Sequence, residues 1–253
     1  MKILSIGNSF STDAHKWLTA VAADVGVELT PYNLYIGRCP LDKHWNNYLS
    51  GAVDYDLQLC GESLRPAALP EVLAMEHWDV ITLQQGSALS GLWDSYQPYL
   101  SDLHRVVKEQ HPQARLFLHQ TWSYEIDSPH EAFANYGRNQ QQMDAAIANA
   151  YEKASAAIST PIIPVGAVIA QLRCTVPELD YAAGGLSLHR DGHHLSWLYG
   201  RYAAALVWCA VLTGCDIRAV RFVPEWEGQR ADPELLQKIN DAVWRAMQVL
   251  SAE

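Results

Sequence analysis

Apolar and polar residues follow two different rhythms along this chain. In the first, a short apolar run stops at a turn residue, as Ile3, Leu4 and Ile6 do before Gly7, which is typical of a buried strand. In the second, apolar residues recur three or four positions apart, as they do over 13–25, which predicts amphipathic helices. The expected strands begin at Lys2 and cover 29–36, 78–84, 114–121 and 161–165, with a short strand or edge at 56–60. The expected helices cover 13–25, 41–49, 67–75, 96–110, 139–158, 166–172, 197–212 and 233–250.

Strands and helices alternate through most of the chain. This order indicates parallel βαβ units, with helices on both faces of one open sheet. Two irregular stretches interrupt it: 122–136 is polar and aromatic and predicts a long loop or lid, and 178–194 is rich in glycine. The sequence contains no internal repeat, low-complexity tract or linker. We therefore expect one α/β domain over 1–253, folded as a three-layer α/β/α sandwich.

Composition and charge narrow the possible functions. The 253 residues are 49% hydrophobic and 18% charged, which is typical of a globular protein with a sizeable core. A net charge of -10 argues against nucleic acid as a partner, since its phosphates need surfaces rich in Lys and Arg. The most apolar stretch, 202–215, is too short to span a bilayer comfortably, so it predicts a buried helix and no membrane contact.

The cysteines bear on the compartment in which the protein works. The five cysteines are widely spaced and contain no C-x-x-C pair, which fits neither a disulfide framework nor a zinc ribbon. Buried free thiols in a reducing compartment are the expectation. The first strand begins at Lys2 with no secretory signal before it, so a cytoplasmic location is expected, although a signal removed earlier would leave the same sequence.

The first candidate for chemistry is Ser9, at the end of the first predicted strand. In an open parallel sheet, ligands bind beyond the carboxyl ends of the strands. Gly7 permits a tight turn there, and the following helix would direct its first N–H groups toward the hydroxyl. The segment lacks the second glycine of the G-x-S-x-G elbow. The alternative is that Asn8, Ser9, Ser11 and Thr12 only cap that helix.

The second candidate is the segment from Asp191 to His194, near the other end of the chain. A serine needs a neighbouring base to act near neutral pH, and histidine is the natural one. The base in turn needs a carboxylate to fix its tautomer, and an Asp three positions before a His in a loop can supply it. Two alternatives stay open: a polar surface loop, or a metal site built from His189, Asp191, His193 and His194.

Together, these two segments resemble the SGNH (GDSL-type) hydrolase superfamily. Residues 7–11, Gly-Asn-Ser-Phe-Ser, are similar to a branch that has this block where other members have Gly-Asp-Ser. The motif order, serine first and Asp-x-x-His last, spans nearly the whole chain. The resemblance implies a flavodoxin-like three-layer sandwich with about five parallel strands. It also implies Ser9 as nucleophile, His194 as general base and Asp191 as its orienting acid, with His193 the less favoured base.

The superfamily also implies an oxyanion hole with three donors. Two are the backbone N–H groups of the serine and of a glycine after the second strand, which fall on Ser9 and Gly37. The third is an Asn side chain after the third strand, and this chain departs from that pattern, because Gln84, Gln85 and Gly86 stand there. The Gln-Gly pair is similar to a block in sialate and xylan O-acetylesterases, and a Gln amide donates the same kind of hydrogen bond. Either Gln84 or Gln85 is expected to fill the role, and simple strand-end polarity is the alternative.

Polar and aromatic residues near the predicted rim suggest a sugar-binding cleft. Aromatic faces beside amide and imidazole groups suit a carbohydrate, whereas the alternative is that the tryptophans are packing residues. The candidates for substrate binding are Arg38, His44, Trp45, Trp93 and Trp122.

The combined pattern predicts a serine esterase that hydrolyses a short acyl ester, above all acetyl, on a carbohydrate or a similar hydroxylated substrate. Such a reaction needs neither a metal nor an organic cofactor, and the expected partner is a small-molecule or oligosaccharide ester. Three alternatives remain: lipid or thioester hydrolysis by the same triad, a glycan-binding module that has lost turnover, and a metal-dependent hydrolase. The sequence does not predict the oligomeric state.

Overall fold

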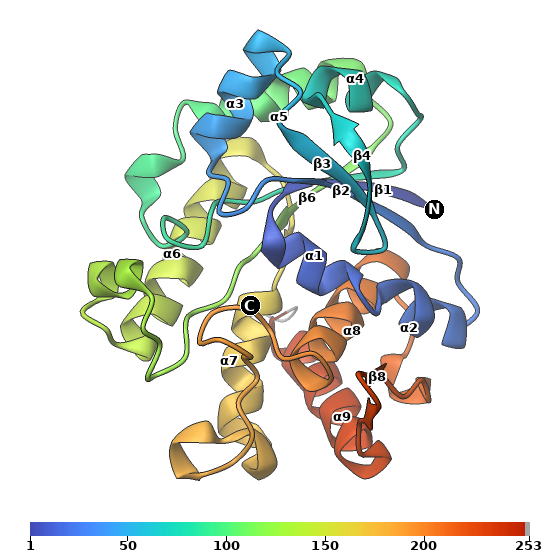
Figure 1. Ribbon diagram of the computed structural model, residues 1–253, viewed down its shortest axis with the longest axis vertical. Coiled ribbons are helices and arrows are strands. Elements are labelled where there is room, and N and C mark those ends of the chain that lie inside the picture. The colour runs from blue at the N-terminus through green and yellow to red at the C-terminus, as the bar shows by residue number, and fades with distance from the viewer. Residues whose placement is uncertain (251–253) are drawn as a thin grey trace.

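One seven-stranded sheet crosses the middle of the molecule in the computed structural model, which describes residues 1–250 (Figure 1). The strands are β1 (Lys2–Gly7), β2 (Thr30–Tyr35), β3 (Tyr55–Leu59), β4 (Glu62–Ala67), β5 (Val80–Leu83), β6 (Arg115–His119) and β7 (Ile162–Ile163). Their spatial order is β4-β3-β2-β1-β5-β6-β7, and neighbours from β2 to β7 run parallel. A separate two-stranded hairpin pairs β8 (Glu225–Trp226) with β9 (Gln229–Arg230).

Helices cover both faces of this sheet. The α-helices are α1 (Ser9–His15), α2 (Leu18–Asp24), α3 (Leu41–Ser50), α4 (Leu69–Ala74), α5 (Tyr99–Gln110), α6 (Gln140–Ile158), α7 (Val165–Thr175), α8 (Tyr199–Thr213) and α9 (Pro233–Leu250). The short 3-10 helices are η1 (Trp93–Ser95), η2 (Glu131–Tyr136), η3 (Pro177–Leu179), η4 (Tyr181–Ala183) and η5 (Ile217–Ala219). In Figure 1, α3, α4 and α5 lie on one side of the sheet and α1, α2, α8 and α9 on the other. This arrangement confirms the predicted three-layer α/β fold with its mostly parallel sheet.

The structure adds an antiparallel hairpin that the hydrophobic pattern did not predict. β3 pairs antiparallel with β2, and β4 pairs antiparallel with β3 at the edge of the sheet. The expected strand at 56–60 therefore corresponds to β3, whereas β4 was missed. The reason is that all of β4 except Ala67 is exposed, so no alternation of apolar and polar residues marks it.

The central strand β1 brings Ser9 to the carboxyl edge of the sheet. β1 lies between β2 and β5, and its residues after Lys2 are buried. α1 then begins at Ser9, four residues earlier than the pattern predicted, because the Asn8 side chain accepts the Phe10 N–H at 3.0 Å and caps the helix. Gly7 is required at this turn, since a Cβ there would lie 2.2 Å from Ser11 Oγ.

The predicted helix 13–25 is two helices in the structure, because α1 ends at His15 and α2 begins at Leu18. The expectations about membrane spans and cysteines can also be compared with the structure. No α-helix within residues 1–250 is long and apolar enough to cross a membrane. All five cysteines are free thiols, but they are not all buried: Cys39 and Cys209 are, whereas Cys174 is exposed.

The core beneath the β1–α1 turn contains polar side chains that bond to one another. Ser5 Oγ lies 3.0 Å from His15 Nε2 and 2.8 Å from Thr82 Oγ1. His119 Nδ1, at the end of β6, lies 3.0 Å from Gln84 Oε1. All five side chains are buried, so each one depends on its neighbours for hydrogen bonds that water would otherwise supply.

The buried histidines His15, His44 and His119 should make the fold sensitive to mild acid. Burial lowers the pKa of each to about 3, whereas a histidine in the unfolded chain titrates near 6.5. Between these values the unfolded chain binds protons that the folded chain does not. Stability is therefore full above about pH 6.5 and falls as the pH decreases toward 3. Each histidine is expected to contribute about 1.4 kcal/mol per pH unit within that window.

Urea unfolding at about pH 7, 6 and 5 measures this dependence. A His44→Gln variant lacks one of the three groups, so the slope of its unfolding free energy against pH should be smaller by about 1.4 kcal/mol per unit. The control is His77→Gln, since His77 is exposed and its replacement should leave the slope unchanged. Equal slopes in His44→Gln and the wild type would contradict the assignment.

Candidate active site

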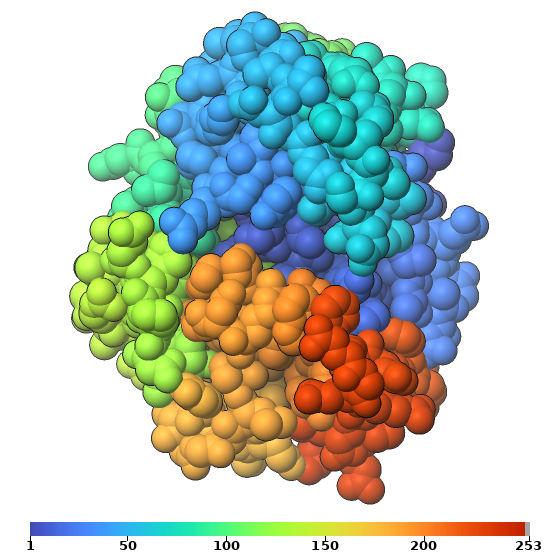
Figure 2. Space-filling model, in the orientation of Figure 1, coloured from blue at the N-terminus to red at the C-terminus, as the bar shows by residue number. Residues whose placement is uncertain are grey.

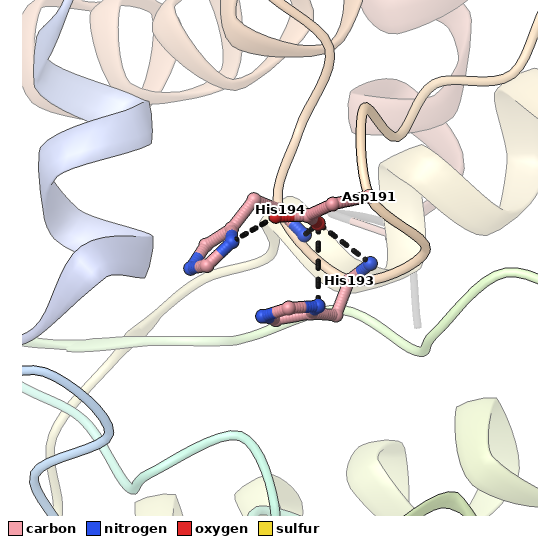
Figure 3. A group of neighbouring side chains, drawn as sticks. All are labelled: Asp191, His193 and His194. Atoms are coloured by element: carbon pink, nitrogen blue, oxygen red, sulfur yellow. Dashed lines mark hydrogen bonds and ion pairs between the residues drawn. The ribbon is translucent and has the colours of Figure 1, made fainter. Parts of the chain in front are cut away.

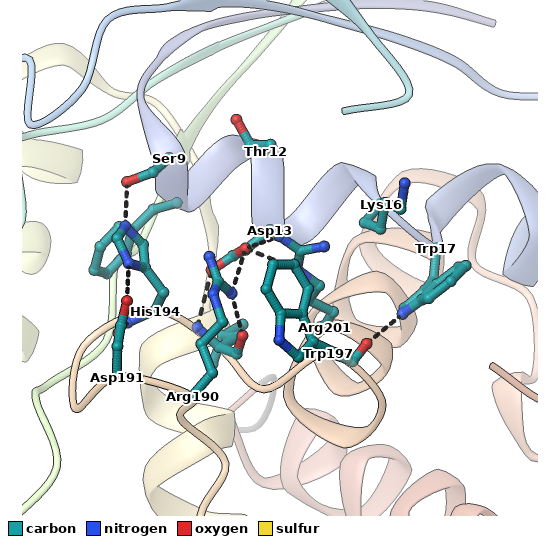
Figure 4. A network of polar contacts seen from close by, with 12 residues as sticks. Ser9, Thr12, Asp13, Lys16, Trp17, Arg190, Asp191, His194, Trp197 and Arg201 are labelled. Carbon is teal, nitrogen blue, oxygen red and sulfur yellow. Dashed lines mark hydrogen bonds and ion pairs between the residues drawn. The ribbon is translucent and has the colours of Figure 1, made fainter. Parts of the chain in front are cut away.

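Ser9, His194 and Asp191 form one continuous line of hydrogen bonds (Figure 4). Ser9 Oγ lies 2.8 Å from His194 Nε2, and His194 Nδ1 lies 2.6 Å from Asp191 Oδ2. Ser9 is the first residue of α1, whereas the other two belong to the loop that precedes α8. The fold therefore brings together the three residues that the sequence proposed as nucleophile, base and acid, in the order that this chemistry needs.

Asp191 is held ionised by the loop around it. Its Oδ1 accepts the backbone N–H groups of His193 at 3.2 Å and of His194 at 2.8 Å. Burial favours the neutral acid, but the hydrogen bonds from the His194 ring and from this backbone outweigh it and hold the pKa of Asp191 well below its usual value. A carboxylate at Nδ1 assigns the ring proton to that nitrogen, so Nε2 offers Ser9 a lone pair.

The loop of residues 184–198, called the base loop after the proposed base His194, closes on itself. Arg190 N–H donates to the His194 carbonyl at 2.9 Å, and Ser196 N–H donates to the Leu188 carbonyl at 2.7 Å. Gly192, between Asp191 and the base, has φ +82°, and a Cβ there would lie 3.0 Å from Ser128 Oγ. Only glycine fits this position without strain, which explains the Asp-Gly-His-His pattern.

Glu125 supports the same loop from the segment after β6. Its N–H donates to the Gly192 carbonyl at 2.8 Å, and its Oε2 lies 3.3 Å from His189 Nδ1 and 2.5 Å from Ser187 Oγ. Burial opposes ionisation of Glu125, but hydrogen bonds, chiefly from His189, lower its pKa to about 2. The other ring nitrogen of His189 faces the Ser123 carbonyl at 3.1 Å. His189 is thus occupied on both nitrogens and does not join the four-residue metal site that the sequence left open.

Asp13 joins the base loop to α1, the helix that carries Ser9 (Figure 4). It lies four residues after Ser9 on α1, so the two side chains leave neighbouring positions on the helix. The Asp13 side chain is fully buried, and its oxygens accept from Arg190 Nη1 at 2.9 Å, the Leu195 N–H at 2.9 Å and Arg201 Nε at 2.8 Å. Two of these donors flank the segment from Asp191 to His194.

Trp197 completes this anchor. The guanidinium groups of Arg190 and Arg201 each lie 4.2 Å from the centre of its indole ring. Stacking on an aromatic face keeps both cations in place without removing their bonds to Asp13. The sequence analysis did not identify Asp13, Arg190, Trp197 or Arg201. Two signals were available: Asp13 interrupts an apolar helical pattern, and Arg201 lies near the start of the apolar helix α8.

The turn around Ser9 also joins the loops that the family resemblance assigns to the oxyanion hole. Asn8 Nδ2 donates to the Cys39 carbonyl at 3.2 Å, which ties the loop after β2 to the end of β1. Gly37 lies in that loop and is exposed. Ser9 N–H, at the first position of α1, forms no hydrogen bond within residues 1–250 and is available to a ligand. The donor role of Ser9 and Gly37 stays a prediction.

The two glutamines after β5 are not equivalent. Gln85 Nε2 donates to the Ser95 carbonyl at 3.1 Å and to Ser95 Oγ at 3.0 Å, so both of its amide hydrogens are engaged and it does not serve an oxyanion. Gln84 Nε2 donates to Asn8 Oδ1 at 2.7 Å, and its Oε1 accepts from Ser11 Oγ. Gln84 retains one amide hydrogen next to the nucleophile turn and is the remaining candidate for the third donor.

Two of the predicted substrate-binding residues are buried, so that prediction is wrong for them. The Trp122 ring is fully buried, stacks on Phe10 with centroids 4.1 Å apart and donates from Nε1 to the His193 carbonyl at 2.8 Å. His44 is also fully buried, and its Nδ1 lies 3.0 Å from Tyr55 Oη. Both are packing residues, and the hydrogen bond from Trp122 to the His193 carbonyl also holds the base loop. Hydropathy does not distinguish these positions from a cleft, because Trp and His occur in both.

Trp45 and Trp93 also pack against neighbours and do not line the cleft beside the triad. Trp45 stacks on Tyr48 within α3, with centroids 5.6 Å apart, and is half-buried. Trp93 lies 5.5 Å from the Tyr96 ring at η1 and is also half-buried.

A cleft of about 430 Å³ lies beside the triad. In Figure 2, the dark-blue start of the chain is visible at the bottom of a hollow beside the orange segment that carries the base. Of the predicted substrate-binding residues, only Arg38 lines the cleft; the others along its wall were not predicted. The lining residues are Arg38, Pro129, His130, Glu131, Asp191 and His193.

Known proteins resemble this chain at two levels. A family model described as "Domain of unknown function (DUF4886)" matches residues 2–238. The crystal structure of a DUF4886 family protein from Bacteroides uniformis is 33% identical, with a TM-score of 0.88 over 98% of this chain and 95% of that one. A candidate SGNH hydrolase from Slackia heliotrinireducens is 23% identical, with a TM-score of 0.57 over 84% of this chain and 98% of that one.

A more distant likeness is to a candidate GDSL-like lipase from Parabacteroides merdae, which is 17% identical, with a TM-score of 0.50 over 84% of this chain and 95% of that one. No curated protein matches the sequence. The structural likenesses show that the α/β fold resembles that of SGNH hydrolases, in agreement with the predicted fold class.

Replacing Asp13 by Asn should separate the base loop from α1 without touching the cleft. Asn cannot neutralise Arg190 and Arg201, so the distance from His194 Nε2 to Ser9 Oγ should become variable. Misplacement of reacting groups by about 1 Å costs about 10²-fold in rate, so kcat on a small ester should fall by that order while KM changes little. Breaking a buried ion pair should also lower the unfolding free energy by about 3–5 kcal/mol.

Steady-state kinetics on the folded variant, with circular dichroism to verify folding, measures both effects. The matched control is Asp216→Asn, which removes the exposed pair with Arg218 (2.6 Å) and should leave kcat unchanged. A folded Asp13→Asn variant that retains the wild-type kcat would show that Asp13 does not position the base.

Proposed function

The chain belongs to the DUF4886 family, and from this starting point we propose that it is a serine esterase. Its substrate would be a short acyl ester, above all an acetyl ester, on a carbohydrate or a similar hydroxylated compound. The observation that carries the proposal is the hydrogen-bonded line from Asp191 through His194 to Ser9, 2.6 Å and 2.8 Å long in its two links. The fold shared with SGNH hydrolases supports it.

Acylation would begin when Ser9 Oγ attacks the ester carbonyl. His194 Nε2 takes the serine proton, and the Asp191 carboxylate stabilises the resulting imidazolium. The negative charge that develops on the carbonyl oxygen would be held by the free N–H of Ser9, with Gly37 N–H and the Gln84 amide as further donors. When the tetrahedral intermediate collapses, His194 returns the proton to the leaving alcohol.

Deacylation would repeat these steps with water. His194 Nε2 removes a proton from a water molecule, the hydroxide attacks the acyl-serine, and Ser9 regains its proton as the acid leaves. The chain's own residues fill every role, so the reaction needs no metal or organic cofactor. Ser9 also lies at the N-terminus of α1, whose dipole favours the oxyanion over the neutral ester.

The cleft wall supports a hydroxylated substrate over a lipid. Except for Pro129, the residues that line it carry imidazole, guanidinium or carboxylate groups, which bind hydroxyls well and acyl chains poorly. A larger cavity of about 800 Å³ contains Met1 and Asp79, which precede β1 and β5. That cavity therefore opens at the amino ends of the parallel strands, the opposite edge of the sheet from Ser9, and does not extend the active site.

Removing either reacting side chain should abolish ester hydrolysis. With 4-nitrophenyl acetate, Ser9→Ala and His194→Ala should each lower kcat/KM by about 10⁴-fold or more, and Asp191→Asn by about 10³–10⁴-fold. Ser101→Ala, an exposed serine on α5, is the control and should match the wild type. Full activity in Ser9→Ala, or loss of wild-type activity in EDTA, would contradict the serine mechanism. Binding of acetylated sugars without turnover would instead identify a module that has lost catalysis.

The acyl chain length distinguishes the proposal from lipid or thioester hydrolysis. The charged and imidazole side chains of the cleft predict that kcat/KM falls steadily from acetyl through butyryl to octanoyl esters, by about tenfold or more across the series, because a long acyl chain would desolvate these groups without reaching an aliphatic pocket. Release of acetate from a panel of acetylated sugars then tests the hydroxylated half of the substrate. A preference for octanoyl over acetyl would favour the lipid alternative.

A further inference from the structure

The Asp191 carboxylate lies between two imidazole rings, although the triad uses only one of them (Figure 3). Its Oδ2 is 2.6 Å from His194 Nδ1, and its Oδ1 is 3.2 Å from His193 Nδ1. Asp191, His193 and His194 each offer one ligand atom, and these atoms all lie within 4.8 Å of one another. Within residues 1–250 no other group of this kind is found.

The ring of His193 has no role in the reaction derived above. Its centroid lies 4.0 Å from that of the His194 ring and 5.0 Å from that of the His130 ring. His193, Asp191 and His130 all line the cleft, so an ion in solution can reach them. Two imidazoles and one carboxylate therefore lie together at the edge of the cleft, with the ring of His130 nearby.

We propose that Asp191, His193 and His194 bind a Zn²⁺ ion and that this ion reversibly inhibits the enzyme. Imidazole nitrogen and carboxylate oxygen are the donors that zinc takes, at about 2.0–2.2 Å, so the ligand atoms of a tetrahedral site lie about 3.3 Å apart. The contacts of 2.6 Å and 3.2 Å at Asp191 lie near that separation, and all three ligand atoms lie within 4.8 Å of one another, so side-chain rotation can bring them to the tetrahedral geometry. Water completes the coordination. Ca²⁺ and Mg²⁺ prefer oxygen ligands and are not expected to bind.

Inhibition follows from the tautomer of His194, and this step depends on the proposed function. Catalysis needs a proton on Nδ1, which faces Asp191, and a lone pair on Nε2, which faces Ser9. A zinc ion takes the lone pair of Nδ1, so the ring proton moves to Nε2. The histidine then donates a hydrogen bond to Ser9 Oγ and no longer accepts the serine proton. The Asp191 carboxylate then coordinates the metal and no longer accepts the hydrogen bond from Nδ1. Removal of zinc restores the original tautomer.

Metal binding is tested first without catalysis, in the Ser9→Ala variant, which retains every proposed ligand. Competition with a chromophoric zinc chelator should show one Zn²⁺ per chain, and Co²⁺ in its place should give the visible absorption of a tetrahedral site. Adding His193→Gln should raise the dissociation constant by about tenfold or more. Adding His104→Gln instead, a part-exposed histidine on α5 outside the site, is the matched control and should leave it unchanged. Equal affinity in the two double variants would overturn the site.

Inhibition is then measured in the chain with its serine intact. Zn²⁺ should lower kcat for 4-nitrophenyl acetate, EDTA should restore it, and His193→Gln should need about tenfold more zinc for the same fractional loss, relative to its own zinc-free rate. Serine-dependent hydrolysis that zinc does not inhibit would overturn the metal proposal and leave the esterase intact. Hydrolysis that EDTA abolishes would overturn both, because zinc would then take part in the reaction.

Discussion

The structure depends on one buried carboxylate, that of Asp13. A charge without access to water is tolerated only when partners neutralise it, and here Arg190, Arg201 and the Leu195 N–H do so. Because Asp13 and Ser9 share α1, this neutralisation also determines where the base loop lies relative to the nucleophile. Ser9 and His194 are 185 positions apart in the sequence, and their side chains lie 2.8 Å apart. The contacts of Asp13, one helical turn after Ser9, hold them there.

The nucleophile turn is rigid for a related reason. Asn8, which follows β1, caps α1 by accepting the Phe10 N–H, and it also bonds to Gln84 after β5 and to the Cys39 carbonyl after β2, so three strand ends converge on one side chain. An amide suits this position better than a carboxylate would, because its nitrogen must donate to Cys39 while its oxygen accepts from Gln84. Asn8, which stands where the Gly-Asp-Ser block has Asp, therefore links the ends of three strands through its side-chain amide.

Three residues outside the base loop hold it in place. This fixed position supports both proposed roles of the loop, in ester hydrolysis and in zinc binding. Asp13 anchors its two sides, Glu125 holds the Gly192 carbonyl, and Trp122 holds the His193 carbonyl. A loop fixed in this way holds His194 next to Ser9, so the proposed reaction would need little further ordering of the base. The same contacts keep His193 next to Asp191, so the residues of the proposed zinc site already lie together.

The sequence alone predicted most of the order of elements and the three residues proposed as the triad. Hydrophobic periodicity located the parallel strands and most helices, because these elements bury a face that must be apolar, and the Gly-Asn-Ser and Asp-x-x-His patterns are short local signals. Only the tertiary structure decided the rest. The exposed strand β4 has no hydrophobic period, and Trp122 and His44 are ambiguous until their neighbours are known. Gln84 and Gln85 are distinguished by their partners, which are Asn8 for the first and Ser95 for the second. The Asp13 anchor and the cleft at Arg38 and His130 come from segments distant in the chain, whose contacts no local pattern encodes.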